Sequence, residues 1–169
     1  MAPLSNVPGP RYHATLQLLR TADTVWNNSR QFFARWDLSP SQFNVMNLLV
    51  ALPQGLSQVE LSRELIMHRS NVTGLIDRLE ARGCVQRQEV PGDRRAYRVV
   101  LTPLGTQLMD QILPDFYRAA EELWAGMPVK RVQDLAQQLM EVCAQANRLS
   151  AELSSSRPAG RTVSSSPKP

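Results

Sequence analysis

The segment from Ser57 to Leu101 constrains the fold more than any other part of the chain, because several local signals follow one another in it. Ser57 and Glu60 form the pattern of a capping box, in which each side chain bonds the backbone N–H of the other residue, so a short helix is predicted to begin here. A second helix is predicted over residues 69–81, because apolar residues recur there on one stripe at helical spacing: Val72, Leu75, Ile76 and Leu79. Gly83 follows and suits the backbone conformation that ends a helix.

Two runs with strand character come next, residues 85–90 and residues 95–101. The residues between them, Pro91-Gly92-Asp93-Arg94, are typical of a turn. Helix, turn, helix and hairpin is the order of a winged helix-turn-helix, in which the second helix enters the major groove of DNA. The sequence therefore predicts a mainly α-helical fold with a small β-hairpin wing.

The face of the second helix opposite its apolar stripe carries small, polar and hydrogen-bonding side chains, which suit base edges and phosphates. The candidate DNA-binding residues are Arg69, Ser70, Asn71, Thr73, Gly74, Asp77 and Arg78 on this helix, and Asp93, Arg94, Arg95 and Arg98 on the hairpin. An ordinary solvated helix beside a charged turn is the alternative. For Arg78 or Arg98 taken alone the two interpretations are balanced, but the whole block in this order favours DNA binding.

Three strings in this block resemble the MarR family of bacterial transcription regulators: LSREL, SNVTGLIDRLEARGCVQR and GDRRAYRVVLTPLG. The resemblance covers about residues 11–153 and implies a dimeric winged-helix protein. It also implies that Arg95 reaches into the minor groove and that Asp93 helps to hold it, as the Asp-x-Arg motif of such wings does. Two residues depart from the family pattern: His68 stands where many members have a Ser or Thr helix cap, and Gly74 where many have a larger polar or basic residue.

The resemblance implies a function as well, which is regulation of transcription by a homodimeric repressor bound to a near-palindromic operator in double-stranded DNA. Members of the family often bind a small aromatic or anionic effector between the dimer helices and the winged lobe. Arg20, Trp26, Phe43 and Met46 are the candidate ligand-binding residues here, although core packing is the favoured alternative for each apolar one. A winged helix that serves as a protein-interaction module is the alternative for the whole lobe, and the arginine-rich hairpin argues against it.

The amino-acid composition and the positions of Pro and Gly divide the chain into three parts. They are an irregular N-terminus over residues 1–10, a MarR-type domain over residues 11–153 and a disordered tail over residues 154–169. Within the domain, the winged helix is expected over about residues 37–101. Dimerisation helices are expected on both sides of it, over about residues 11–36 and residues 103–153.

Three further signals refine this division. Ser39 and Gln42 form a second capping box, with Pro40 at the first helical position, so a helix of the lobe begins there. Pro114 is expected to kink or split the helix that follows the wing. Apolar residues then recur at alternating spacings of three and four, which defines a seam for packing against another helix: Val132, Leu135, Leu139, Val142, Ala146, Leu149 and Leu153. Packing within the chain is the alternative to packing across a dimer.

Several functional classes are disfavoured by what the sequence lacks. No apolar run is long enough for a membrane span, and the N-terminus lacks the features of a secretion signal, so a cytoplasmic location is expected. His13 and His68 are the only histidines, and no zinc, nucleotide or nucleophile motif occurs, so we expect no enzyme activity, metal or cofactor. Cys84 and Cys143 do not make a disulfide framework and are expected to pack as small apolar residues. The net charge of +4 fits an anionic partner such as DNA without proving one.

Overall fold

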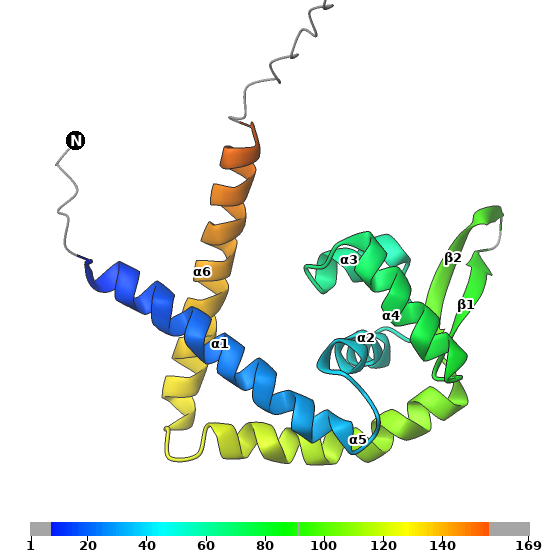
Figure 1. Ribbon diagram of the computed structural model, residues 1–169, viewed down its shortest axis with the longest axis horizontal. Coiled ribbons are helices and arrows are strands. Elements are labelled where there is room, and N and C mark those ends of the chain that lie inside the picture. Colours follow the sequence, from blue (N-terminus) through cyan, green and yellow to red (C-terminus); the bar gives the residue numbers. More distant parts are fainter. Residues whose placement is uncertain (1–7, 91, 156–169) are drawn as a thin grey trace, which may run out of the picture. The chain divides into compact units, whose positions relative to one another are not determined.

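The computed structural model describes residues 8–90 and 92–155, apart from the side chains of residues 93–96 and 154–155. The described chain forms six helices and one two-stranded sheet (Figure 1). Their bounds are α1 Pro10–Ala34, α2 Pro40–Ala51, α3 Gln58–Glu64, α4 Arg69–Ala81, β1 Val85–Val90, β2 Asp93–Leu101, α5 Pro103–Leu123 and α6 Val129–Ser155. This confirms the predicted mainly α-helical fold with a β-hairpin wing. Most of the predicted irregular N-terminus and disordered tail lies outside the described residues.

The chain divides into two compact units, one that extends to Tyr117 and one that begins at Arg118. The first unit contains α1 to α4, the hairpin and most of α5, and the second contains the end of α5 and all of α6. Pro114 was expected to kink or split this helix, and the split does not occur, since α5 continues through Pro114 as one helix. Each described helix is too short or too polar to span a lipid bilayer.

Both predicted capping boxes are present. The backbone N–H of Ser39 donates to Oε1 of Gln42 at 2.9 Å, and the N–H of Gln42 donates to Oγ of Ser39 at 3.2 Å. At the start of α3, the N–H of Ser57 donates to Oε2 of Glu60 at 2.7 Å, and the N–H of Glu60 donates to Oγ of Ser57 at 3.3 Å. The bonds from Ser57 hold the pKa of Glu60 below its usual range, with smaller contributions from nearby arginines.

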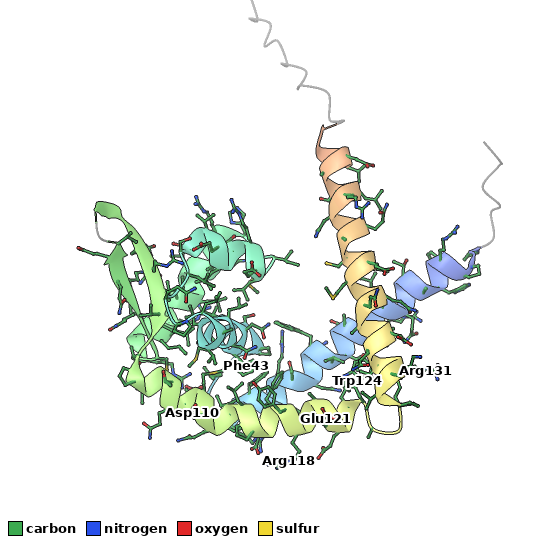
Figure 2. The ribbon with its side chains drawn as sticks, turned by 180° about the vertical axis from the view of Figure 1, so that it is seen from behind. Phe43, Asp110, Arg118, Glu121, Trp124 and Arg131 are labelled. Carbon is green, nitrogen blue, oxygen red and sulfur yellow. The ribbon has the colours of Figure 1, made fainter. Side chains whose placement is uncertain are left out.

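The core of the first unit is built on two sets of side chains. The predicted apolar stripe of α4 is fully buried, and burial of each such side chain stabilises the fold by roughly 1.5–3 kcal/mol. An aromatic cluster lies between α1, α2 and α5, where the ring of Phe43 stacks 4.3 Å from Phe33 and lies 4.7 Å from Phe116. Phe43, labelled in Figure 2, extends from α2 toward these two rings.

The wing is an antiparallel pair in which Val85 lies opposite Leu101 and Val90 lies opposite Asp93, with an irregularity at Glu89 and Val90. The turn is therefore shorter than the four residues predicted, because Asp93 and Arg94 already belong to β2. Residue Pro91 lies outside the described residues.

The base of the wing is joined to the loop between α2 and α3 by a bridge from Leu56 to Val99, with N–H···O distances of 3.1 and 2.8 Å. Gly55 makes this approach possible, because its φ is +75° and a Cβ atom there would lie 2.4 Å from the carbonyl oxygen of Val99. The loop that leads into α3 is thereby fixed to β2.

Candidate DNA-binding interface

The recognition helix α4 begins with an uncommon cap. Nδ1 of the His68 ring accepts the backbone N–H of Ser70 at 3.4 Å and lies 2.8 Å from the Ser70 hydroxyl oxygen. The ring thus satisfies one of the free N–H groups at the start of the helix, as a Ser or Thr side chain does in many helices. The departure from the family pattern at His68 therefore keeps the capping function.

A hollow of about 350 Å³ lies along the polar face of α4. Its lining residues are Ser41, Met67, Ser70, Asn71, Gly74, Leu75 and Arg78. Four of them, Ser70, Asn71, Gly74 and Arg78, are candidate DNA-binding residues that the helical spacing placed on one face. The helical spacing did not indicate Ser41 and Met67, because they reach this surface from α2 and from the turn before α4.

Two arginines on α4 are available to a partner. Arg69 and Arg78 are exposed, and neither forms an ion pair with any residue that the structure describes. A guanidinium group without a protein partner can bind phosphate or a guanine edge with two parallel hydrogen bonds. The exposed face of α4 therefore combines hydrogen-bonding groups, unpaired positive charge and a glycine that permits close approach.

Thr73 and Asp77 are engaged with other parts of the same domain. The Thr73 hydroxyl donates to the carbonyl oxygen of Arg69 at 3.0 Å and accepts a hydrogen bond from the side-chain amide of Gln58 on α3. Oδ1 of Asp77 lies 2.5 Å from Nη2 of Arg87 on β1. Both residues were grouped with the DNA-facing set by helical spacing alone, which cannot show which neighbouring element lies beside them.

Arg98 is held at the base of the wing. Its Nε lies 3.1 Å from the carbonyl oxygens of Gln54 and Gly55, and Nη2 lies 2.7 Å from the latter. Nη2 also lies 3.6 Å from a carboxylate oxygen of Glu60. The guanidinium group that was expected to face DNA thus fastens the wing to the loop before α3.

The tip of the wing carries the remaining candidates, Asp93, Arg94 and Arg95. Their backbone belongs to β2, and their side chains lie outside the described part of the structure. Their contacts with DNA remain predictions from the sequence.

A second hollow, of about 590 Å³, lies where α1 meets the start of α2. Its lining residues are Trp26, Arg30, Ala34, Asp37, Leu38, Ser39, Pro40, Ser41 and Gln42. Of the four candidate ligand-binding residues, only Trp26 lies here. Phe43 and Met46 are 1% and 0% exposed and belong to the core, which was the favoured alternative for these apolar candidates. Arg20 lies on the exposed surface of α1.

A family model described as MarR family matches residues 36–96. The HTH-type transcriptional repressor NicR of Pseudomonas putida is 30% identical over 116 residues, which cover 67% of this chain and 72% of NicR. The chain belongs to the MarR family.

Two further proteins are similar over most of the chain. The HTH-type transcriptional regulator PapX of Escherichia coli is 29% identical over 119 residues, which cover 69% of this chain and 73% of PapX. The crystal structure of CouR from Rhodococcus jostii RHA1, bound to p-coumaroyl-CoA, superposes with a TM-score of 0.70 at 24% identity, covering 76% of this chain and 90% of CouR. This MarR-family chain is a DNA-binding transcriptional regulator. Its relatives are transcriptional regulators, so the alternative of a protein-interaction module does not fit them, and they are not enzymes.

Proposed function

We propose that this MarR-family chain is a homodimeric repressor that inserts one α4 helix from each protomer into successive major grooves of a near-palindromic operator. The polar hollow along α4 is the observation that carries the proposal, because Ser70, Asn71, Gly74 and Arg78 share it. Asn71 can pair with an adenine edge, and Arg78 can bind a guanine edge or a phosphate. The wings then lie over the flanking minor grooves, where Arg95 reads the groove width.

The salt dependence of binding tests this arrangement. Arg69, Arg78, Arg94 and Arg95 are the arginines assigned to DNA in each protomer, so about four phosphates are neutralised per protomer. The logarithm of the association constant should then fall against the logarithm of salt concentration with a slope of about −3.6 per protomer, or about −7 for a dimer. DNA fragments retained by the purified protein from a random pool supply the operator. A flat salt response, or no selection of duplex DNA, would contradict the proposed interface.

The dimer is proposed from the apolar seam of α6. Leu139, Val142 and Leu149 are 37%, 52% and 50% exposed within the described residues, so apolar side chains of this 27-residue helix meet solvent in the single chain. Burial against a second copy would remove this apolar surface from water.

Substitution on the seam tests the dimer. Leu139→Asp should abolish it in sedimentation experiments, because burial of a carboxylate costs several kcal/mol. Gln137→Asp is the matched control, since position 137 lies on the opposite face of the helix. A wild-type monomer at micromolar concentration, or equal behaviour of the two variants, would refute the proposal.

The second hollow is proposed as an effector site for a small aromatic anion. The indole of Trp26 offers a surface for an aromatic ring, and the exposed guanidinium of Arg30 offers two hydrogen bonds to a carboxylate. CouR, which has the same fold, is bound to p-coumaroyl-CoA, an aromatic acyl thioester with anionic groups.

Calorimetric titration with p-coumarate or p-coumaroyl-CoA tests the effector site. Arg30→Ala should weaken binding, while Arg20→Ala, on the same helix but outside the hollow, should not. Equal effects of the two variants would place the ligand elsewhere, and no binding of either probe would remove this class of effector.

A further inference from the structure

We propose that Arg87 is a positioning residue, which fixes the wing against the recognition helix instead of contacting DNA itself. Arg87 lies on β1, opposite Val99, and points at the polar side of α4. The inference rests on the α4 interface proposed above, and it assigns a role to a residue that neither the helical spacing nor the wing motif singled out.

The first observation is that Arg87 joins β1 to α4 through three bonds. Nη2 lies 2.5 Å from Oδ1 of Asp77, and Nη1 pairs with Oε2 of Glu80. The backbone N–H of Arg87 donates to the other carboxylate oxygen of Glu80 at 3.0 Å. Glu80 therefore holds both the main chain and the side chain of this strand residue, which fixes the distance between β1 and the last turns of α4.

The second observation is that the same guanidinium reaches the other strand of the wing. Cζ of Arg87 lies 5.4 Å from the centre of the Tyr97 ring on β2. The Tyr97 hydroxyl donates to Oε1 of Gln58 at 2.8 Å, and the amide nitrogen of Gln58 donates to the Thr73 hydroxyl and, at 3.2 Å, to the carbonyl oxygen of Arg69. A continuous polar chain thus runs from α4 through β1 and β2 to α3 and back to the start of α4.

The third observation concerns charge. Asp77 and Glu80 would both repel the phosphates of bound DNA, and the positive charge of Arg87 offsets one of their two negative charges within the domain. The Arg87 side chain is only 24% exposed. Burial works to lower the pKa of its guanidinium, but bonds to Asp77 and Tyr97 and the charge of Glu80 outweigh burial and raise that pKa. A guanidinium that binds two carboxylates and is largely buried has fewer exposed N–H donors left for a phosphate than a free one has.

The structural consequence is that the wing and the recognition helix are held as one unit before DNA arrives. Interactions that order a binding surface in the free protein reduce the freedom lost on binding. The Asp77–Arg87 pair therefore aids DNA binding even though one of its members is an acid on the DNA-binding helix.

The direction in which two substitutions change operator affinity distinguishes this role from an ordinary phosphate contact. Arg87→Lys keeps the positive charge but cannot bridge Asp77 and Glu80 with a planar fork. As a positioning residue, Arg87 should give about tenfold weaker operator binding in both Arg87→Gln and Arg87→Lys, which corresponds to one ordered side chain. Asp77→Asn should also weaken binding, whereas removal of an acid that merely repels phosphate would tighten it.

The experiment measures operator affinity at fixed salt for wild type, the two Arg87 variants, Asp77→Asn and Tyr97→Phe. Arg148→Gln is the control for loss of one positive charge, because Arg148 is exposed on the side of α6 away from the apolar seam. Hydrogen exchange of the β1 amides in the free protein is a second readout, and it should quicken in Arg87→Gln. Thermal unfolding verifies that each variant is folded, and Asp77→Asn and Tyr97→Phe carry the test if Arg87→Gln does not fold.

Wild-type affinity in Arg87→Lys together with tighter binding in Asp77→Asn would overturn the proposal and make Arg87 a phosphate contact. Unchanged exchange of the β1 amides in folded Arg87→Gln would overturn it as well. Failure of the wild type to bind any operator would instead refute the proposed interface, so the two failures are distinguishable.

Discussion

Gly74→Ala is expected to stabilise the protein and weaken its binding to DNA at the same time. Gly74 lies within α4, in the middle of the hollow along its polar face. A Cβ atom built there meets only Nη1 of Arg78, at 3.6 Å, which is ordinary van der Waals contact. Because alanine is favoured over glycine inside a helix by about 1 kcal/mol, the free energy of unfolding should rise by about that amount, and Tm by about 2–4 °C.

The loss of DNA affinity follows from the same geometry. The added methyl group lies in the hollow where a base edge would approach, and loss of one specific base contact costs about 1–3 kcal/mol. Gly105→Ala is the comparison at a second helical glycine, because a Cβ atom on Gly105, near the start of α5, would lie 1.9 Å from the carbonyl oxygen of Cys84. That variant should be strongly destabilised, because no side chain can move to relieve a clash with backbone.

Thermal unfolding and titration of one operator at fixed salt decide the matter. A stability gain with unchanged affinity and unchanged operator preference would show that Gly74 does not face DNA. A stability loss in Gly74→Ala would show that the space around this residue is not as open as the structure has it.

Three other changes have defined outcomes. Arg95→Ala should weaken binding to all related operators with little change in stability. Asp93→Ala should also weaken operator binding if the Asp93 carboxylate orients the Arg95 guanidinium. Tighter binding by Asp93→Ala in the same titration would refute that orientation. The lowered pKa of Glu60 contributes stability that is present above about pH 4.5, the ordinary pKa of a glutamate, and is lost as the pH falls through the pKa of the folded protein. Glu60→Gln, which can still bond the N–H of Ser57, should therefore flatten the acid limb of a pH–stability profile. Ile66 has a φ of +52° and is 78% exposed, so Ile66→Gly should raise the free energy of unfolding by about 0.5–1 kcal/mol in denaturant titrations, the left-handed strain of roughly 1–2 kcal/mol less the entropy of glycine.

The elements that the sequence predicted well are those set by local chemistry. The capping boxes at Ser39 and Ser57 and the limits of the recognition helix depend on residues three or four positions apart, and Gly83 adopts the left-handed φ of +69° that ends α4. The apolar stripe of α4 is buried because its spacing needs no knowledge of the partner elements. Local pattern was insufficient at Ile66, whose β-branched side chain disfavours the conformation that the turn between α3 and α4 imposes.

The bonding partners of the arginines could not be predicted, because they depend on contacts between distant parts of the chain. Arg98 bonds to a loop 43 and 44 residues earlier, and Arg87 bonds to acids 7 and 10 residues earlier on another element. From the sequence, Arg98 was a candidate DNA contact, and no local pattern indicated the bonding partners of either arginine. The candidate DNA surface on α4 was predictable by helical periodicity, whereas its division into groups that face outward and groups that hold the domain together was not.

Three arginines that hold the domain together also define how a ligand near α1 could affect DNA binding. Arg87 and Arg98 fix the two strands of the wing to α4 and to the loop before α3. Arg82, at the end of α4, bonds to the carbonyl oxygens of Trp36, at 3.1 Å, and of Asp37. Asp37 is also a lining residue of the hollow beside α1. A ligand that displaces this loop must therefore strain the bonds to Arg82 or move α4 with it. Because the wing is tied to α4, the two elements proposed to contact DNA would move together.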